Sequence, residues 1–535
     1  MSAISSEAAP PARFTADDVV KAMLAPRVKL DVWSHGVRIS GFGNDVRTMM
    51  LDMCRQVWGE YSMVRVGRFR TEKKITRVYA GSNKQRSYFH FHRNSLPKVM
   101  AGLERLGIPS HRIEITEHEL YEPVKVNHPL HDERPPREKQ LPIIEYLIAP
   151  PDPRYAPSKV VTLQTGGGKT YLSLYALRAI GVRTAIILKG MYIDKWIGDI
   201  EEAYGAEKGA LMVIRGIPQL RAAIEMARQG AFKPRVVVFS NKTMFMLMKY
   251  YEQHGVDEFI PVSPMDLYKH LGIGVRLIDE VHQEFHCNFR QDIYTHIPLT
   301  ASLSATLEPD SPFIRDMYEL VWPPGTWAPE MEYNKFIAVK SIWYRLNDPG
   351  KLRWLNFMRQ YSHTEYEKSI LKHPQILQNY LDMIADLVVQ LFMCKREPGQ
   401  KMMIFVATVQ MATIVQEMLA NIYPNLIVNR YVSEDEYEDL VGADISVTTL
   451  QSAGTAVDIP NLRVTLMTTA LSTKQGNIQV LGRTRPLIGW PDVTPEFCFL
   501  SAKDVDKHVT YAKEKREKLS GKVKSFQDLQ SDYRV

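Results

Sequence analysis

The sequence predicts an α/β protein in which two domains built on parallel sheets follow a small α+β domain. From about residue 137, short β-branched runs alternate with helical stretches, and a second set of such runs begins at about residue 400. This alternation is typical of parallel strands joined by crossover helices. Before residue 130 the strand-like segments instead follow one another closely, with alternating apolar residues. We therefore expect domains at 1–130, 131–335 and 336–535.

Length and composition agree with several globular domains. The chain has 535 residues, and about 150 residues per domain gives three or four units. No run of about 18 apolar residues occurs, so no membrane span is expected. The first residues, MSAISSEAAPPARFTADD, lack the apolar segment of a secretory signal. The four cysteines form no CxxC pair, which argues against zinc and disulfides and predicts a cytoplasmic location.

The small first domain is predicted from period-two alternation and from helix caps. A proline-containing stretch, 127–136, follows it and reads as a linker. We expect helices at 44–58 and 94–108, strands at 28–33, 36–43 and 111–115, and a meander of strands at 61–69, 75–81 and 87–93.

The whole net charge of the protein lies in this first domain. Residues 1–130 hold 20 Lys and Arg against 13 Asp and Glu, an excess of +7 that equals the excess of the full chain. Such a cluster is either a solvated face or a surface that binds a polyanion such as nucleic acid. Nine cations stand between residues 65 and 93 against one acid: Arg65, Arg68, Arg70, Lys73, Lys74, Arg77, Lys84, Arg86 and Arg93.

The two later domains are predicted from two sets of short apolar runs. A helical stretch without strand pattern, about 350–397, separates the sets as an insertion in the third domain. The expected strands are 159–164, 184–189, 235–240, 275–280 and 302–307 in the first set, and 401–408, 426–432, 445–450, 463–469 and 497–502 in the second.

A glycine-rich loop, LQTGGGKT at 163–170, lies between a predicted strand and a predicted helix. Glycines there let backbone N–H groups curl around a phosphate, and the helix directs its positive end toward the same place. Lys169 would reach the outer phosphates, and the Thr170 hydroxyl would hold Mg²⁺. A glycine turn without function is the alternative, and Leu163 stands where the full phosphate-loop pattern has glycine.

Two carboxylates, Asp279 and Glu280, end the predicted strand VRLIDE. Carboxyl ends of parallel strands face the same crevice as a phosphate-binding loop. We therefore expect Asp279 to join the Mg²⁺ shell and Glu280 to orient and deprotonate an attacking water.

Five motifs in this order resemble those of superfamily 2 helicases of the DExH type: TGGGKT, DEVH, SAT, GTAVDIP and QVLGRTRP. The resemblance covers about residues 137–500 and implies two RecA-like motor domains. The small basic first domain further resembles the architecture of phage recombination and repair helicases of the UvsW type. The resemblance to superfamily 2 helicases also removes the objection from Leu163, since that superfamily does not demand glycine at this position of the loop.

The resemblance also implies roles for single residues. Arg137 and Gln140 match an upstream motif that reads adenine, which implies ATP. Trp196 falls where the family contacts nucleic acid, although a core aromatic is an equal alternative. The resemblance further implies ATP-loop residues Thr165, Gly166, Gly167 and Gly168, coupling residues His282, Ser304, Thr306 and Gln479, a nucleic-acid contact at Thr449, and nucleotide contacts at Gly454 and Asp458.

One departure from the family pattern concerns the arginine that would stabilise the transition state. The second arginine of the last motif would fall at residue 486, which is Pro486, so Arg483 or Arg485 takes that role.

The expected function is that of an ATP-dependent DNA helicase or translocase with Mg²⁺. The resemblance implies branched DNA or R-loops as substrates, in recombination, repair or replication restart, with replication or recombination proteins as partners. Two alternatives stay open: an RNA helicase with the same motor, and a nucleotide-gated nucleic-acid-binding module that does not need hydrolysis.

Overall fold

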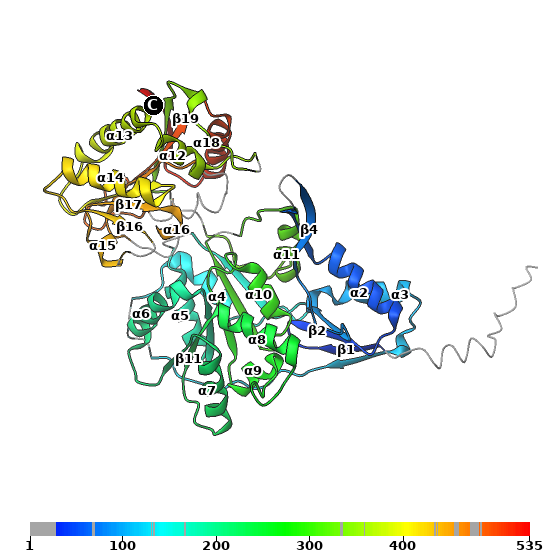
Figure 1. Cartoon of the computed structure of the whole chain (residues 1–535). Helices are drawn as coiled ribbons and strands as arrows, with labels where there is room; N and C mark the ends of the chain where they lie inside the picture. Colours follow the sequence, from blue (N-terminus) through cyan, green and yellow to red (C-terminus); the bar gives the residue numbers. More distant parts are fainter. Residues whose placement is uncertain are drawn as a thin grey trace, which may run out of the picture.

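The predicted fold class is confirmed in a computed structural model of the chain. It has two all-parallel sheets of six and seven strands, as in RecA-like domains, and a smaller mixed sheet at the N-terminal side (Figure 1). The structure describes residues 28–66, 70–129, 131, 134–164, 167–305, 307–331, 335–357, 359–432, 435, 437–453, 459–470, 481 and 484–535.

The first parallel sheet has the strand order β10-β11-β9-β12-β13-β8. Its strands are β8 (Ser158–Thr162), β9 (Thr184–Leu188), β10 (Leu211–Ile214), β11 (Val236–Ser240), β12 (Val275–Ile278) and β13 (Leu299–Ser304). Only β10, a short edge strand, was not expected from the sequence. The helices are α4 (Leu141–Ile148), α5 (Lys169–Ile180), α6 (Ile193–Tyr204), α7 (Ile217–Arg228), α8 (Asn241–His254), α9 (Pro264–His270), α10 (Phe285–Asp292) and α11 (Pro312–Val321).

Both faces of this sheet are buried, because successive strand residues point to opposite sides. Ile186 and Leu188 of β9 belong to one core with α4, α5 and α6. Ala185 and Ile187 belong to a second core with α7 to α11. Covering on both faces explains why these strands read as continuous apolar runs rather than as alternating ones.

The second parallel sheet has the order β16-β17-β15-β18-β19-β14-β20. The strands are β14 (Ala338–Arg345), β15 (Lys401–Val406), β16 (Val428–Tyr431), β17 (Ile445–Thr449), β18 (Leu462–Met467), β19 (Glu496–Ala502) and β20 (Ser525–Arg534). The sequence pattern missed β14 and β20. The helices are α12 (His363–Ile370), α13 (Pro374–Val388), α14 (Val409–Ile422), α15 (Tyr437–Gly442), α16 (Leu450–Ala453) and α18 (Asp506–Leu519).

The expected insertion at about 350–397 is part of the core of this second domain. Tyr366 of α12 and Ile384 of α13 are fully buried against it. One helix among the described residues, Pro374–Met393, is long and apolar enough to cross a membrane, and half of it is buried inside the structure. Its place in the core accounts for its apolar composition.

The N-terminal domain contains a five-stranded sheet and a separate hairpin. The sheet order is β5-β6-β2-β1-β7, with β1 (Val28–Val32), β2 (Gly36–Ser40), β5 (Gly81–Ser82), β6 (Tyr88–His92) and β7 (Ile113–Glu117), and its helices are α2 (Asn44–Gln56) and α3 (Leu96–Arg105). The remaining strands, β3 (Gly59–Arg65) and β4 (Thr71–Val78), pair with each other instead. The predicted three-stranded meander is therefore wrong: two of its strands form a hairpin that leaves the sheet.

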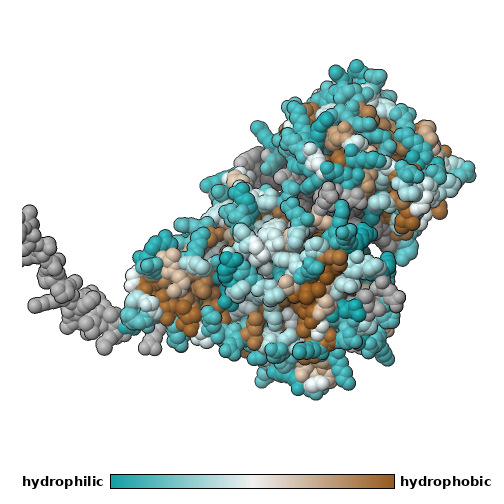
Figure 2. Space-filling view, turned by 180° about the vertical axis from the view of Figure 1, so that it is seen from behind, coloured by the Kyte–Doolittle hydropathy of each residue, from teal (hydrophilic) through white to brown (hydrophobic). Residues whose placement is uncertain are grey.

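The N-terminal domain shares one hydrophobic core with the first parallel-sheet domain. Val37 and Phe91 of its sheet belong to the same buried cluster as Phe289 of α10. A Cβ on Gly36 would lie 2.0 Å from the carbonyl oxygen of Ile293, so the two domains meet backbone to backbone at this point. The back view shows apolar patches over this joined body and a more hydrophilic second parallel-sheet domain (Figure 2).

Candidate active site

The glycine loop follows β8 and turns directly into α5. Gly168 has a φ of +84°, a left-handed conformation that favours glycine, and precedes the first helical residue, Lys169. A Cβ on Gly168 would lie 2.6 Å from Gln140 Nε2, and one on Gly167 would lie 2.7 Å from Leu163 Cγ. Close packing therefore favours glycine at residues 167 and 168, and the backbone conformation favours it at residue 168 as well.

Gln140, expected near the nucleotide, lies against this loop. Its Nε2 donates to the Gly167 carbonyl at 2.9 Å, and its Oε1 accepts from the Arg137 backbone N–H at 2.9 Å. The Arg137 side chain is exposed, and the Thr170 side chain is half-buried in the first turn of α5. The structure thus brings the upstream segment and the loop together, although they are 27 residues apart.

Asp279 and Glu280 follow β12 and face the start of α5. Lys169 Nζ lies 2.5 Å from Glu280 Oε1, and both side chains are largely buried. Asp279 Oδ1 accepts from the Glu280 N–H at 2.9 Å. The residues predicted from two separate motifs therefore form one cluster at the carboxyl edge of the first sheet.

Trp196, expected to contact nucleic acid, is a core residue. Its indole is 1% exposed and its Nε1–H donates to Asp279 Oδ2 at 2.9 Å. A fully buried ring has no surface for nucleic acid, so this expectation is corrected in favour of the core alternative. Its place in α6, 83 residues before Asp279, gave no sequence signal for this bond.

The two carboxyl groups have opposite pKa shifts. Burial raises the pKa of Asp279, with Lys169 acting in the other direction. For Glu280, burial is opposed by the Lys169 ammonium and by His282, and the net result is a lowered pKa. Glu280 has a φ of +47°, which is strained for a residue with a Cβ. Strain of this kind is typical of sites where a side chain must be held in one direction.

His282 links this cluster to the end of β13. Its Nδ1 lies 2.6 Å from Ser304 Oγ and 3.5 Å from Glu280 Oε2. Burial lowers the pKa of His282 to about 4, so the ring is neutral at pH 7. The predicted coupling residues His282 and Ser304 are therefore in direct contact, next to the carboxylate.

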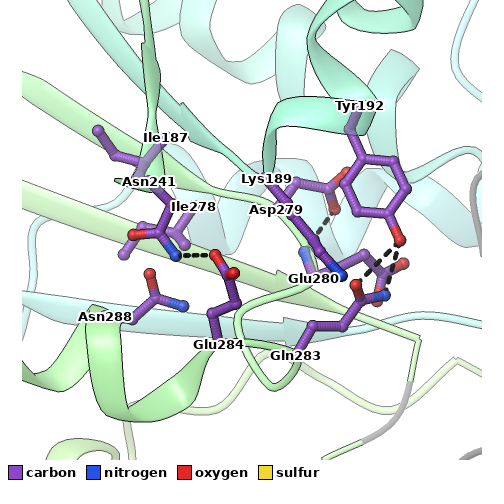
Figure 3. A pocket seen from close by; sticks show the side chains of 10 residues that line it. All are labelled: Ile187, Lys189, Tyr192, Asn241, Ile278, Asp279, Glu280, Gln283, Glu284 and Asn288. Carbon is purple, nitrogen blue, oxygen red and sulfur yellow. Dashed lines mark hydrogen bonds between the residues drawn. The ribbon is translucent and has the colours of Figure 1, made fainter. Parts of the chain in front are cut away.

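A pocket opens beside the carboxylates, and its remaining wall was not predicted from the sequence. Tyr192 and Gln283 hydrogen-bond each other on one side, and Asn241 donates to Glu284 on the other (Figure 3). Lys189 and Asn288 also line it. These residues follow β9, β11 and β12, and the shared carboxyl edge of those strands was the available signal.

The donors at this edge fit Mg²⁺ better than a dedicated transition-metal site. Among the described residues no group of three His, Cys, Asp or Glu is arranged to hold a metal. Mg²⁺ is held in proteins by one or two carboxylates together with water and phosphate oxygens. Glu280 Oε2 is buried and has no hydrogen bond to any residue that the structure describes, so it could accept one from water.

Some of the predicted basic residues of the N-terminal domain lie on the β3–β4 hairpin, and the others lie outside it. Lys84 and Arg86 are exposed beyond the hairpin, whereas Arg93 is half-buried and donates to the Trp33 carbonyl at 3.4 Å. The hairpin carries Arg70, Lys73, Lys74 and Arg77 in the described part and also the backbone of Arg65. His90 and His92 of β6 are fully buried.

Two of the predicted site residues in the second parallel-sheet domain lie within the described part of the chain. Thr449 ends β17, is 7% exposed and has its Oγ1 2.9 Å from Ser452 Oγ. Arg485 is half-buried after a turn in which the Thr484 N–H donates to Leu481. The predicted residues outside the described part are Arg68, Thr165, Gly166, Thr306, Gly454, Asp458, Gln479 and Arg483, as is the side chain of Arg65.

Comparison with solved structures finds distant likeness in fold. The chain is 13% identical to Saccharomyces cerevisiae Dbp5 bound to RNA and ADP BeF3, over 74% of this chain and 90% of that one, with a TM-score of 0.48. It is 14% identical to Mss116p bound to ssRNA and AMP-PNP, over 74% of each chain, with a TM-score of 0.47. A fragment described as an HsdR subunit of a type I restriction enzyme from Vibrio vulnificus is 14% identical over 76% and 70%, with a TM-score of 0.48. No family model and no curated protein matches the chain.

Proposed function

We propose that this protein is an ATP-hydrolysing motor that moves along nucleic acid, and that its substrate is branched DNA or an R-loop. The observation that carries the proposal is the cluster of Lys169, Asp279 and Glu280 at the carboxyl edge of one parallel sheet. A second parallel-sheet domain follows in the same chain. Two such domains allow a cleft whose closing and opening is linked to hydrolysis.

The proposed chemistry assigns one task to each side chain. Glu280 takes a proton from the attacking water as its general base. Lys169 leaves Glu280 and binds the outer phosphates of ATP. Asp279 and Thr170 would hold Mg²⁺, which when bound neutralises phosphate charge. Arg483 or Arg485 would stabilise the transition state from the second domain.

DNA is proposed because of charge and of the resemblance to phage branched-DNA helicases. The net charge of +7 lies wholly in residues 1–130. Contacts to phosphates carry little sequence information, so recognition by nucleic-acid structure is expected rather than recognition of sequence. A role in recombination, repair or replication restart, in the cytoplasm and with partner proteins of those processes, belongs to the same proposal.

The test is the ATPase rate of the full chain with single-stranded DNA, duplex DNA, a four-way junction and RNA. We expect stimulation by DNA, greatest with the junction, and loss of all turnover in Glu280→Gln. Stimulation by RNA alone would assign the motor to RNA instead. Equal, unstimulated rates with all four would overturn the motor proposal.

A further inference from the structure

The β3–β4 hairpin is an exposed element of the N-terminal domain that stands apart from its five-stranded sheet. Most of its described side chains are exposed, and its strands pair with no other strand in the described part of the chain. In Figure 1 it projects from the end of the domain, clear of the five-stranded sheet. Residues 59–78 hold six Lys and Arg against two Glu, a net +4 out of the +7 of the whole chain.

The two faces of the hairpin differ in how their charges are neutralised. The register places Ser62 opposite Lys74 and Val64 opposite Glu72 on one face. Near that face Glu72 pairs with Arg70 at 3.0 Å and with Lys74 at 3.3 Å, and toward the base Glu60 pairs with Arg77 at 3.4 Å. These cations are already matched with carboxylates.

The opposite face combines exposed apolar groups with a cation that pairs with no acidic side chain in the described ranges. Tyr61 lies opposite Ile75 and Met63 opposite Lys73, so these side chains share one face. Tyr61 is 44% and Met63 60% exposed. Lys73 Nζ lies 5.3 Å from the centre of the Tyr61 ring and pairs with no carboxylate among the described residues. A ring, a thioether and a cation side by side can stack on a base and bind a phosphate.

The base of the hairpin is fixed to the helix that follows the catalytic carboxylates. The helix α10 begins at Phe285, three residues after His282. Its His286 Nε2 lies 3.3 Å from the Val78 carbonyl, and its Arg290 donates to the Ala80 carbonyl. Tyr79, 1% exposed, packs edge-on against Phe289 with ring centres 5.1 Å apart. The hairpin therefore keeps a fixed position relative to the proposed ATP site.

We propose that the face formed by Tyr61, Met63 and Lys73 binds nucleic acid at the point where a duplex parts into two strands. The ring and the thioether would cover the last base pair, whose outer surface is apolar, and the ammonium would contact its phosphate. Positive charge favours nucleic acid over an average protein surface. This inference rests on the proposed function, since the motor would bring the duplex to the β3–β4 hairpin, which is fixed in place.

The test uses two matched substitutions of the full chain. Lys73→Ala and Lys74→Ala remove the same charge from opposite faces. We expect Lys73→Ala to reduce the slope of log affinity against log salt for a forked DNA duplex by about 0.9, and Lys74→Ala to change it much less. Tyr61→Ala should weaken fork binding about tenfold and slow unwinding, while ATPase stimulated by single-stranded DNA stays within twofold of the wild type. Unchanged melting temperatures would show that all three variants fold.

Separate outcomes distinguish failure of the proposal for the β3–β4 hairpin from failure of the proposed motor function. An ATPase that no nucleic acid stimulates in the wild type overturns the proposed function itself. The hairpin proposal alone is overturned if the ATPase is stimulated but fork binding and unwinding are unchanged in both Tyr61→Ala and Lys73→Ala. This face would then be assigned to a protein partner. Equal effects of Lys73→Ala and Lys74→Ala also overturn the hairpin proposal, because the two faces would then be equivalent.

Discussion

Lys169 Nζ lies 2.5 Å from Glu280 Oε1, so the two groups with the central tasks in the proposed hydrolysis neutralise each other in this structure. In the proposed mechanism Lys169 would exchange this carboxylate for a phosphate oxygen when ATP binds. That exchange would free Glu280 to act as the base. One contact would thereby couple occupancy of the site to the availability of its base.

Glu280→Gln is expected to bind ATP at least as tightly as the wild type, because the carboxylate that competes for Lys169 is removed. Turnover should fall by roughly 10²- to 10⁴-fold through loss of the base. Fluorescent-nucleotide binding and single-turnover hydrolysis measure the two effects. Glu284→Gln, in the same pocket but bonded to Asn241, is the matched control and should retain turnover. Weaker ATP binding in Glu280→Gln would contradict the competition.

Trp196→Phe is expected to act through Asp279. The change keeps an apolar ring but removes the N–H donor to a buried carboxylate, which costs roughly 1–3 kcal/mol of unfolding free energy. The pKa of Asp279, already raised by burial, should rise further, and the acid limb of the ATPase pH profile should move to higher pH. Trp322→Phe is the control, because the buried Trp322 Nε1 has no hydrogen-bond partner in the described part of the chain. A selective loss of nucleic-acid affinity in Trp196→Phe would instead support a surface role.

Arg483→Ala and Arg485→Ala are expected to differ. The arginine that reaches the γ-phosphate supports turnover by a factor of roughly 10³–10⁵. Its loss should lower turnover at saturating ATP and leave nucleic-acid affinity unchanged, and the other change should have a small effect. Steady-state ATPase and fluorescence anisotropy separate the two readouts. Normal hydrolysis in both variants would show that neither residue is the arginine that reaches the γ-phosphate.

Lys515→Met is expected to stabilise the protein. Lys515 is buried with its Nζ 4.1 Å from the centre of the Phe499 ring, and burial lowers its pKa to about 7. His508 and His363 face it, with pKa values lowered chiefly by burial, and Lys518 lies on the same helix. Between pH 7 and 10.5 the unfolded chain binds a proton that the folded chain lacks, so stability rises with pH there.

The gain in Lys515→Met should be on the order of 3 kcal/mol at pH 7 and should vanish toward pH 10.5, as measured by urea unfolding at several pH values. Lys513→Met, exposed on the same helix, is the control and should change little. A gain that does not depend on pH would assign the effect to packing alone.

Arg290→Met should loosen the N-terminal domain. Arg290 pairs with Glu252 and donates to backbone carbonyls at the base of the hairpin, with side chains 14% exposed on both partners. Leaving Glu252 without its partner should cost about 3 kcal/mol of unfolding free energy. Arg315→Met, at an exposed pair with Asp316, is the matched control and should cost little. The N-terminal domain and the first parallel-sheet domain are expected to unfold in a single cooperative transition, since they share a core.

The sequence by itself determined the fold class, most strands and the residues that form the cluster of Lys169, Asp279 and Glu280. Parallel strands buried on both faces appear as apolar runs, and glycine at residue 168 and acids at the end of β12 appear as local patterns. The hydrogen bond of Trp196 to Asp279, the buried positions of His90 and His92, and the strands β14 and β20 at one end of the second parallel sheet had no such local pattern.

Only the tertiary structure decided which side chains meet and which domains are joined. A strand pattern is the same whether its residues pair in a sheet or leave it as a hairpin, so β3 and β4 could not be placed from alternation alone. Burial of a histidine or a tryptophan depends on what packs on its face, here α10 for the N-terminal sheet and β12 for Trp196. These contacts join residues that are tens to hundreds of positions apart, and no local pattern encodes them.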